Sequence, residues 1–260
     1  MIEWLLAPVD PSRAHEVGAL VSWHGRLMVL AWGTLFPLGI LIARFCKITR
    51  RQDWPRELDN KAWWHAHLGL QYTGGGAMLA ALALILMAGG AGQSTHAYVG
   101  WVIVGFAGLQ FLAGWFRGTK GGPTEPDLRG DHFDMTPRRL VFEHFHKFAG
   151  YGLLALAAWG VVSGMWLANA LVWMWLTLGA WWTVLVAAFI ALQRRGKAVD
   201  TYQAIWGPDP GLPGNQRKPI GWGVWRLDGK DWSAAAEPGS ISPTPSGSGR
   251  RPDPQGHRSR

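Results

Sequence analysis

The chain has 260 residues and a formal net charge of +8, and 48% of its residues are hydrophobic. Its lysines and arginines flank long apolar runs instead of lining one face, which argues against a nucleic-acid-binding protein. The 18 tryptophans are far above ordinary usage, and several lie at the ends of apolar runs, as in the aromatic belts of membrane proteins. These features predict an integral membrane protein in contact with a lipid bilayer.

The first apolar run predicts a membrane-spanning helix over residues 18–45. The segment before it, residues 1–17, lacks the pattern of a cleavable signal peptide. The stretch from His24 to Arg44 would cover ~30 Å, which is the thickness of the hydrocarbon core. Pro37 lies in the second half of this helix and is tolerated in a membrane where neighbouring groups satisfy the carbonyl that it frees.

Four further apolar runs complete the prediction of an all-α membrane protein with five transmembrane helices. They are expected to span the membrane at residues 63–89, 96–116, 142–167 and 171–192. The predicted organisation is an N-terminal segment (1–17), a transmembrane domain (18–193) and a tail (194–260). Tryptophans up to residue 232 suggest that this part of the tail packs on the membrane-facing surface, whereas residues 233–260 are expected to be disordered.

The charge of the connections predicts the orientation of the helices. Lysines and arginines concentrate in the connections 46–62 and 117–141 and after residue 193, whereas the connections 90–95 and 168–170 carry no charge. The positive-inside rule therefore predicts an extracytoplasmic N-terminus and a cytoplasmic tail. In a bacterium, which the composition suggests as the source, the protein would lie in the inner (plasma) membrane.

With this topology, histidines in four of the helices lie at two depths. His24 and His96 lie near the outer ends of the first and third helices. A histidine doublet opens each of the second and fourth helices at the inner side: His65 with His67, and His144 with His146. Residues two apart on a helix point ~200° apart, so one member of each doublet faces the bundle.

We choose His67 and His146 as the inward members of the two doublets. Gln71 and Gly74 share a helix face with His67, and Gly150 shares a face with His146. The other member of each doublet lies nearer the water, where an imidazole costs less free energy. The sequence therefore predicts an outer pair, His24 with His96, and an inner pair, His67 with His146.

Imidazole rings inside a membrane are costly and mark functional sites. Two imidazoles that face each other across a helix bundle suit bis-histidine binding of a haem, and this chain supplies two such pairs in a four-helix core. Cys46 is the only cysteine, so each haem would be held without a CxxC attachment motif. Small residues near the pairs could give the macrocycle room: Gly69, Gly74, Gly75, Gly100, Gly105, Gly150 and Gly152.

Two other interpretations of the histidines are alternatives to haem binding. Interfacial histidines can snorkel towards water, but the paired depths disfavour this. A zinc site is disfavoured because neither pair has a carboxylate or thiolate at ligand spacing. The remaining histidines, His15, His132 and His257, lie in loops or in the tail and are expected to be solvated.

These stretches resemble the cytochrome b561 family, in particular the b561 domain that eukaryotes fuse to DOMON modules. The matching residues are His24 to Met28 with Pro37, Gly39, Ala43 and Arg44, Trp63 to Gln71 around His67, His96 with Gly100 and Gln110, and Phe142 to Gly150 around His146. The resemblance covers about residues 20–193. It implies two b-type haems held by the same two pairs, and electron transfer across the membrane, often from cytoplasmic ascorbate to an acceptor outside.

The chain departs from this family pattern in two ways. No DOMON module is expected in these residues, and Phe142-Glu143 replaces the Trp-Asn usual before the last ligand. The expected function is electron transfer between a small-molecule or protein donor and an acceptor on opposite faces of the membrane, with oxidoreductase activity and a homodimeric assembly both left open. The alternative is a haem-containing anchor or relay subunit of a larger oxidoreductase, and a haem-free transporter or scaffold is a third hypothesis.

Charged residues near the two pairs have two interpretations each. Arg26 is the only charged residue in the outer half of a helix, and it either binds a propionate of the outer haem or snorkels to the interface. On the inner side, four basic residues either hold propionates or an anionic reductant, or anchor the topology, which is favoured: Lys61, Arg138, Arg139 and Lys147. The sequence leaves the donor, the acceptor and the direction of electron flow open.

Overall fold

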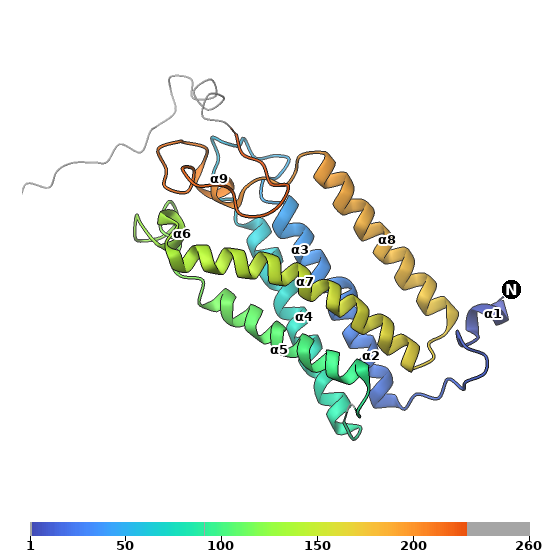
Figure 1. Cartoon of the computed structure of the whole chain (residues 1–260). Coiled ribbons are helices and arrows are strands. Elements are labelled where there is room, and N and C mark those ends of the chain that lie inside the picture. The colour runs from blue at the N-terminus through green and yellow to red at the C-terminus, as the bar shows by residue number, and fades with distance from the viewer. Residues whose placement is uncertain (1, 91, 228–260) are drawn as a thin grey trace, which may run out of the picture.

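The computed structural model describes residues 2–90 and 92–227, and in them the chain is helical apart from two isolated bridges between single residues (Figure 1). The helices of these residues are α1 (Ile2–Leu6), α2 (Ala19–Leu30), the π-helix η1 (Ala31–Leu35), α3 (Phe36–Phe45), α4 (Ala62–Met87), α5 (Thr95–Trp115), α6 (Asp131–Asp134), α7 (Pro137–Leu167), α8 (Val172–Arg194) and α9 (Thr201–Trp206). The predicted disorder of residues 233–260, and the placement of Trp232 and His257, lie outside the described residues.

Five helical spans in the described residues are long and apolar enough to cross a membrane, as predicted: Ala19–Phe45, Ala62–Met87, Thr95–Trp115, Pro137–Leu167 and Val172–Arg194. The chain is an integral, multi-pass membrane protein. The fourth span begins five residues earlier than predicted, at Pro137, because the hydroxyl of Thr136 accepts from the backbone N–H of Arg139 and Pro137 occupies the first turn. Its charged first turns project beyond the apolar run from which the helix was predicted.

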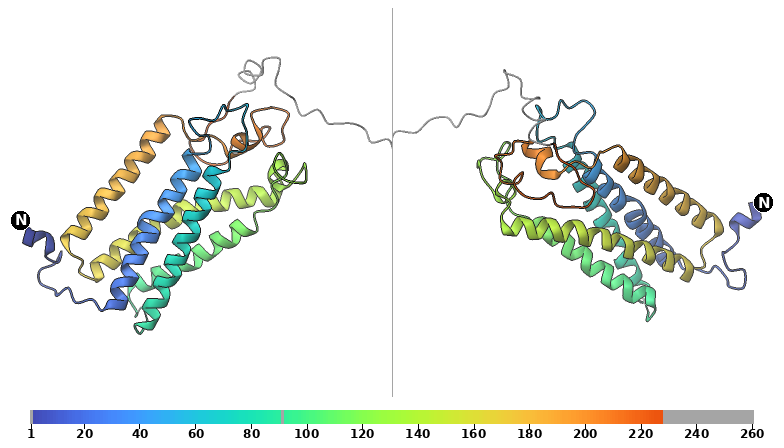
Figure 2. Two further views of the ribbon diagram at one scale, coloured as in Figure 1. Left: turned by 180° about the vertical axis from the view of Figure 1, so that it is seen from behind. Right: turned by 45° about the horizontal axis from the view of Figure 1, so that its top comes forward.

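Four of the spans form the core of the bundle as two close pairs. The first span (α2, η1 and α3) packs along α4, and α5 packs along α7 (Figure 1). Buried side chains from all four spans meet between the pairs: Ala31, Trp32, Phe36, Met78, Ile103, Ala107, Leu153, Ala157 and Val161. The fifth span, α8, lies outside the two helix pairs, alongside α3 (Figure 2), and contributes Leu178 to the same buried cluster.

The break in the first span explains how α8 attaches to the core. Pro37 has no N–H, so the carbonyl of Gly33 one turn earlier lacks its helical donor, and the helix widens into η1 at this point. The indole N–H groups of Trp181 and Trp182 both donate to Gly33 O, at 3.1 and 3.2 Å. Two side chains of α8 therefore satisfy the carbonyl that Pro37 frees, as expected for proline in a membrane helix.

Three segments gather at one end of the bundle and cover it. They are residues 46–61, residues 116–136 with α6, and residues 195–227 with α9 (Figure 1). We call residues 195–227 the cap, and this end the capped end. Tyr202, Ile205 and Trp206 of α9 are buried against Met135 and Ile220. The tryptophan-containing part of the tail therefore packs on the end of the bundle.

The cap overturns the expectation that His132 is solvated. The ring of His132 is 2% exposed and lies between α6 and α9, with its centroid 5.7 Å from that of Tyr202 and 5.8 Å from that of Trp206. Burial holds the pKa of His132 well below its usual value. The sequence placed His132 in a loop, and it could not show that the tail folds over that loop. His15, by contrast, is exposed, with Nδ1 2.9 Å from Ala168 O.

Candidate cofactor sites between facing histidines

The outer histidine pair bridges the two helix pairs of the core. His24 on α2 and His96 on α5 have ring centroids 6.5 Å apart, with ring planes at 89°. Gly164 of α7 makes room for the ring of His96, because a Cβ at this position would lie 2.8 Å from Cε1 of His96. The predicted outer residues therefore face each other at the end of the bundle opposite the cap.

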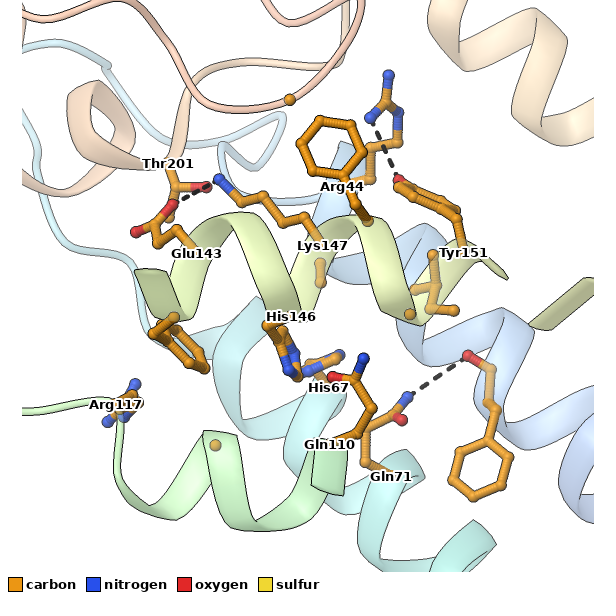
Figure 3. A pocket seen from close by; sticks show the side chains of 18 of the residues that line it. Arg44, His67, Gln71, Gln110, Arg117, Glu143, His146, Lys147, Tyr151 and Thr201 are labelled. Atoms are coloured by element: carbon orange, nitrogen blue, oxygen red, sulfur yellow. Dashed lines mark hydrogen bonds and ion pairs between the residues drawn. The ribbon is translucent and has the colours of Figure 1, made fainter. Parts of the chain in front are cut away.

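The inner histidine pair repeats this geometry near the capped end. His67 on α4 and His146 on α7 have ring centroids 6.4 Å apart, with ring planes at 86°, and point toward one another (Figure 3). Their doublet neighbours do not take part. His65 is exposed, and His144 is exposed with its Nδ1 2.8 Å from Leu140 O of its own helix.

The spacing of the rings in each pair fits a metal ion between them. A metal bound at ~2.0 Å by one nitrogen of each of two opposed imidazoles separates the ring centroids by about 6 Å. The observed separations of 6.5 and 6.4 Å match this value. Direct edge-to-face packing of two rings covers the same range, so the positions of the ring protons are needed as a second criterion.

Hydrogen bonds place the ring proton of His24 and His67 away from the facing ring. Nδ1 of His24 lies 2.9 Å from Ala81 O, and Nδ1 of His67 lies 3.0 Å from Gly39 O. A carbonyl oxygen only accepts, so both Nδ1 atoms donate and both Nε2 atoms keep their lone pairs. This arrangement is typical of histidines that bind a metal through Nε2.

His96 is held in the same way through a hydroxyl group. Its Nδ1 lies 3.1 Å from Oγ of Ser163, and that hydroxyl donates its own proton to Gly160 O at 3.0 Å. Nδ1 of His96 is therefore the donor to Ser163. His146 differs from the other three, because its Nδ1 is buried without a hydrogen-bond partner.

A cavity of about 500 Å³ adjoins the inner pair and reaches from the middle of the bundle to the cap. Trp32 and Phe36 line it from the first span, and Gln110 and Phe111 line it from α5. Ile220 and Trp222 of the cap close its far side. The cavity thus joins two facing imidazoles to a largely apolar chamber large enough for a flat organic group.

Basic side chains surround the part of the cavity nearest the cap. Five of its lining residues are basic: Arg44, Lys47, Arg117, Arg139 and Lys147. The buried carboxylate of Glu143 accepts from Nε of Arg139 at 3.0 Å. It also accepts from Nζ of Lys147 at 2.6 Å (Figure 3). The lining keeps an excess of positive charge, which suits an anionic group such as a propionate.

Three of these cations also fasten the cap to the helices. Nζ of Lys147 donates to Ile220 O at 3.0 Å, and a guanidinium nitrogen of Arg44 donates to Trp222 O at 2.7 Å, with the Trp222 ring stacked on the guanidinium at 4.5 Å. Nζ of Lys47 donates to Val199 O at 3.0 Å. Burial, with the positive charge of Lys147 as the next cause, lowers the pKa of Lys47 to about 7.

The remaining predicted charges lie away from the rings. Arg26 is exposed, with its guanidinium 5.1 Å from the centroid of Trp23. Lys61 and Arg138 are exposed, and Nε of Arg138 donates to Phe116 O at 3.0 Å. Topology anchoring suits Lys61 and Arg138, and snorkelling suits Arg26. Arg139, which is 7% exposed, belongs instead to the buried network.

Six of the seven predicted glycines fall into two groups, and the seventh, Gly150, has Nε2 of Gln110 3.8 Å from the position of a Cβ. A Cβ at Gly74 would lie 2.9 Å from Phe36, and one at Gly75 would lie 2.7 Å from Phe111, so these two make room for protein side chains. Four others have no heavy atom within 4 Å of a Cβ: Gly69, Gly100, Gly105 and Gly152. Sequence reasoning missed Ser163 and Gly164, which lie four and three residues before Leu167 and belong to no recognisable motif.

A metal site made by protein side chains alone is not found in the described residues. Among residues 2–90 and 92–227, no group of three or more His, Cys, Asp or Glu side chains could hold a metal ion. Each histidine pair therefore offers two ligands on opposite sides of a central point. Two axial ligands suit a metal whose other positions are filled by a macrocycle, and the residues present fit such a group.

Comparison with known proteins supplies relatives for the membrane part. A cytochrome b561, DM13 and DOMON domain-containing protein of Arabidopsis thaliana is 27% identical over 152 residues, which cover 58% of this chain and 15% of that protein. Ferric-chelate reductase 1 of Homo sapiens is 29% identical over 157 residues (58% of this chain, 25% of that protein). A cytochrome b561 and DOMON domain-containing protein of A. thaliana is 25% identical over 194 residues (70% and 42%).

The chain is related to the cytochrome b561 family. The aligned region covers 15% to 42% of the length of these relatives. The other domains and the activities in their names are therefore properties of those proteins. No family model and no solved structure matches the chain. The b561 relationship therefore rests on the aligned membrane region.

Proposed function

We propose that this b561-related chain transfers electrons across the membrane through two b-type haems, one between His24 and His96 and one between His67 and His146. Bound haem supplies a one-electron carrier, and two imidazole ligands leave no open position on the iron, which favours electron transfer over oxygen binding. The observation that most supports the proposal is the repeated ring geometry, with centroid separations of 6.5 and 6.4 Å in one bundle.

The residues around each pair position the ligands. The carbonyls of Ala81 and Gly39 and the hydroxyl of Ser163 each hold an Nδ1 proton, which keeps the Nε2 lone pair directed at the site. Arg44, Arg139 and Lys147 would neutralise propionates of the inner haem. At the outer haem, Arg26 either binds a propionate or snorkels to the interface, and its exposed guanidinium on Trp23 favours the second role.

The orientation follows from the basic connections at the capped end. The positive-inside rule places this end in the cytoplasm, and in a bacterium the chain would lie in the inner membrane. Electrons would pass between a donor and an acceptor on opposite faces, and an oxidoreductase activity toward a small anionic compound would use the basic residues near the cap. The resemblance to b561 proteins suggests ascorbate as one such donor.

A second candidate function is that of a relay subunit for a partner protein. It is favoured by the aligned share of the relatives, 15% to 42% of their length, because those proteins are named for DOMON or DM13 domains in addition to the b561 part. In this role the haems pass electrons for a partner, and the chain alone does not reduce a soluble acceptor.

Electron transfer across a sealed membrane tests the proposal. The purified chain is reconstituted into liposomes with trapped ferricyanide, and ascorbate is added outside. The proposal predicts bleaching of the trapped ferricyanide and haem b bands in the reduced-minus-oxidised spectrum. Haem bands without bleaching would favour the relay subunit. A spectrum without haem bands would contradict both functions.

A further inference from the structure

One of the four proposed ligands lacks the support that holds the other three. Nδ1 of His24, His67 and His96 each has an acceptor within 3.1 Å, whereas Nδ1 of His146 is buried without a partner. A metal-bound histidine almost always donates its second ring N–H to an acceptor. A buried donor without an acceptor also costs free energy. An acceptor for His146 is therefore expected on a neighbouring helix.

Gln110 of α5 is in the right place to supply it. Both polar atoms of its amide are buried without a hydrogen-bond partner. Gln110 and His146 line the same cavity, and Figure 3 shows the Gln110 side chain beside the His146 and His67 rings. A Cβ at Gly150, one helical turn after His146 on the same face, would lie 3.8 Å from Nε2 of Gln110. The amide therefore lies against the turn of α7 that holds His146.

We infer that Gln110 is the positioning residue of the inner site, and that its Oε1 accepts the Nδ1 proton of His146 when haem is bound. The amide presents either its oxygen or its nitrogen after a half-turn of its last torsion, so the acceptor can face the ring without movement of the helix. This completes a set of four supports: two backbone carbonyls, one hydroxyl and one amide. The inference rests on the proposed function, because it assigns a role toward the inner haem.

The role predicts the sign of a redox shift. An acceptor at Nδ1 makes the imidazole a stronger donor to iron and favours the ferric state. Gln110→Leu should therefore raise the midpoint potential of the inner haem, and Gln110→Glu, with a stronger acceptor, should lower it. Loss of such a support typically weakens binding about tenfold. A tenfold change in the ratio of ferric to ferrous affinity corresponds to ~59 mV for a one-electron couple.

The experiment is a redox titration of the purified, haem-loaded protein, with the low-spin electron paramagnetic resonance spectrum as a second readout. A His24→Ala background, which should keep the inner haem alone, assigns the inner potential. Ser163→Ala is the matched control, since it removes the corresponding support from His96. We expect Gln110→Leu to shift only the inner signal and Ser163→Ala to shift only the outer one.

Three outcomes separate the hypotheses. Shifts of opposite sign in Gln110→Leu and Gln110→Glu, confined to the inner haem, support the role. Unchanged potentials in both Gln110 variants, while Ser163→Ala shifts the outer haem, overturn it and leave the proposed function intact. Absence of haem from the wild-type protein refutes the proposed function itself. If Gln110→Leu does not fold, Gln110→Asn, whose amide is too short to reach the ring, should shift the inner potential with the same sign.

Discussion

The two ends of the bundle hold the same pair of histidines in different surroundings. At the capped end, His67 and His146 adjoin a cavity with five basic side chains and a cap formed by residues 195–227. At the opposite end, where α4 joins α5 and α7 joins α8 (Figure 1), His24 of α2 faces His96 in the first turn of α5. A shared ligand geometry can therefore serve sites that differ in charge and in access to water, which are two of the factors that tune a haem.

Glu143 provides the largest expected change at the capped end. Its carboxylate accepts from both Arg139 and Lys147 and is 4% exposed, so Glu143→Leu leaves two cations without their anion. Removing one partner of a buried ion network costs about 3–5 kcal/mol. We expect the cap to detach, which is measured as faster proteolysis after residue 195. Glu16→Leu, at an exposed position, is the control, and equal proteolysis of the two variants would contradict the role of Glu143.

The cap should also respond to pH through Lys47. Its pKa is lowered to about 7 by burial, from a usual value of 10.5. Between these values the unfolded chain binds a proton that the folded chain has lost, so this group makes stability rise with pH. Four charged groups that face Lys47 also shift its pKa. The positive charges of Lys147 and Arg44 lower it, and the carboxylates of Asp200 and Glu143 raise it.

Thermal unfolding in detergent between pH 6.5 and 9.5 measures this effect. We expect the midpoint of the wild-type protein to rise with pH and that of Lys47→Met to rise less. Lys61→Met, which changes an exposed lysine near the same end, serves as the matched control. A wild-type midpoint that falls with pH over this range, or an unchanged slope in Lys47→Met, would contradict the assignment.

Substitutions of the two tryptophans that attach α8 should have non-additive effects on the free energy of unfolding. Either indole of Trp181 and Trp182 can satisfy Gly33 O, so each single change to Phe should cost under about 1 kcal/mol. The double variant leaves the carbonyl unpaired and should cost about 1–3 kcal/mol. A double-mutant cycle of unfolding free energies tests this, with Trp173→Phe on the same helix as control. Strict additivity would show that the two indoles act separately.

The smallest effect is expected at Arg26, at the opposite end. Its guanidinium is exposed and stacks on Trp23 at 5.1 Å, a contact worth about 0.5–1 kcal/mol. Arg26→Gln should therefore keep the outer haem content and shift its potential little, in contrast to Arg139→Gln at the inner site. Spectra of the two variants compare the ends directly. Loss of the outer haem in Arg26→Gln would favour the propionate interpretation of Arg26.

Much of the membrane part could be predicted from sequence because its physics is local. An apolar run long enough to cross a bilayer has few alternatives to a helix, and the depth of a histidine follows from its place in that run. Helical periodicity alone did not decide between the members of each doublet. The choice of His67 and His146 rested on the residues that share their helix faces, on the position of His65 and His144 nearer the water, and on the resemblance to the b561 family. The effect of Pro37 was also foreseeable, although its partners on α8 were not.

The parts that escaped prediction depend on contacts between distant segments. His132 was expected in water, but the fold of the cap buries it beside Tyr202 and Trp206. The supports of Nδ1 come from Ala81, Gly39 and Ser163, which no spacing rule connects to their histidines. Long-range packing decides which residues become such partners, and the pattern of a single sequence does not show which distant segments pack together.

The number of haems per chain tests the central claim most directly. Haem b is extracted and quantified against protein for the wild type and for His96→Ala and His146→Ala. Two haems in the wild type and one in each variant, with different residual spectra in the two variants, are the predicted result. A single haem in the wild type, or loss of all haem from a folded single variant, would contradict two separate sites between facing histidines.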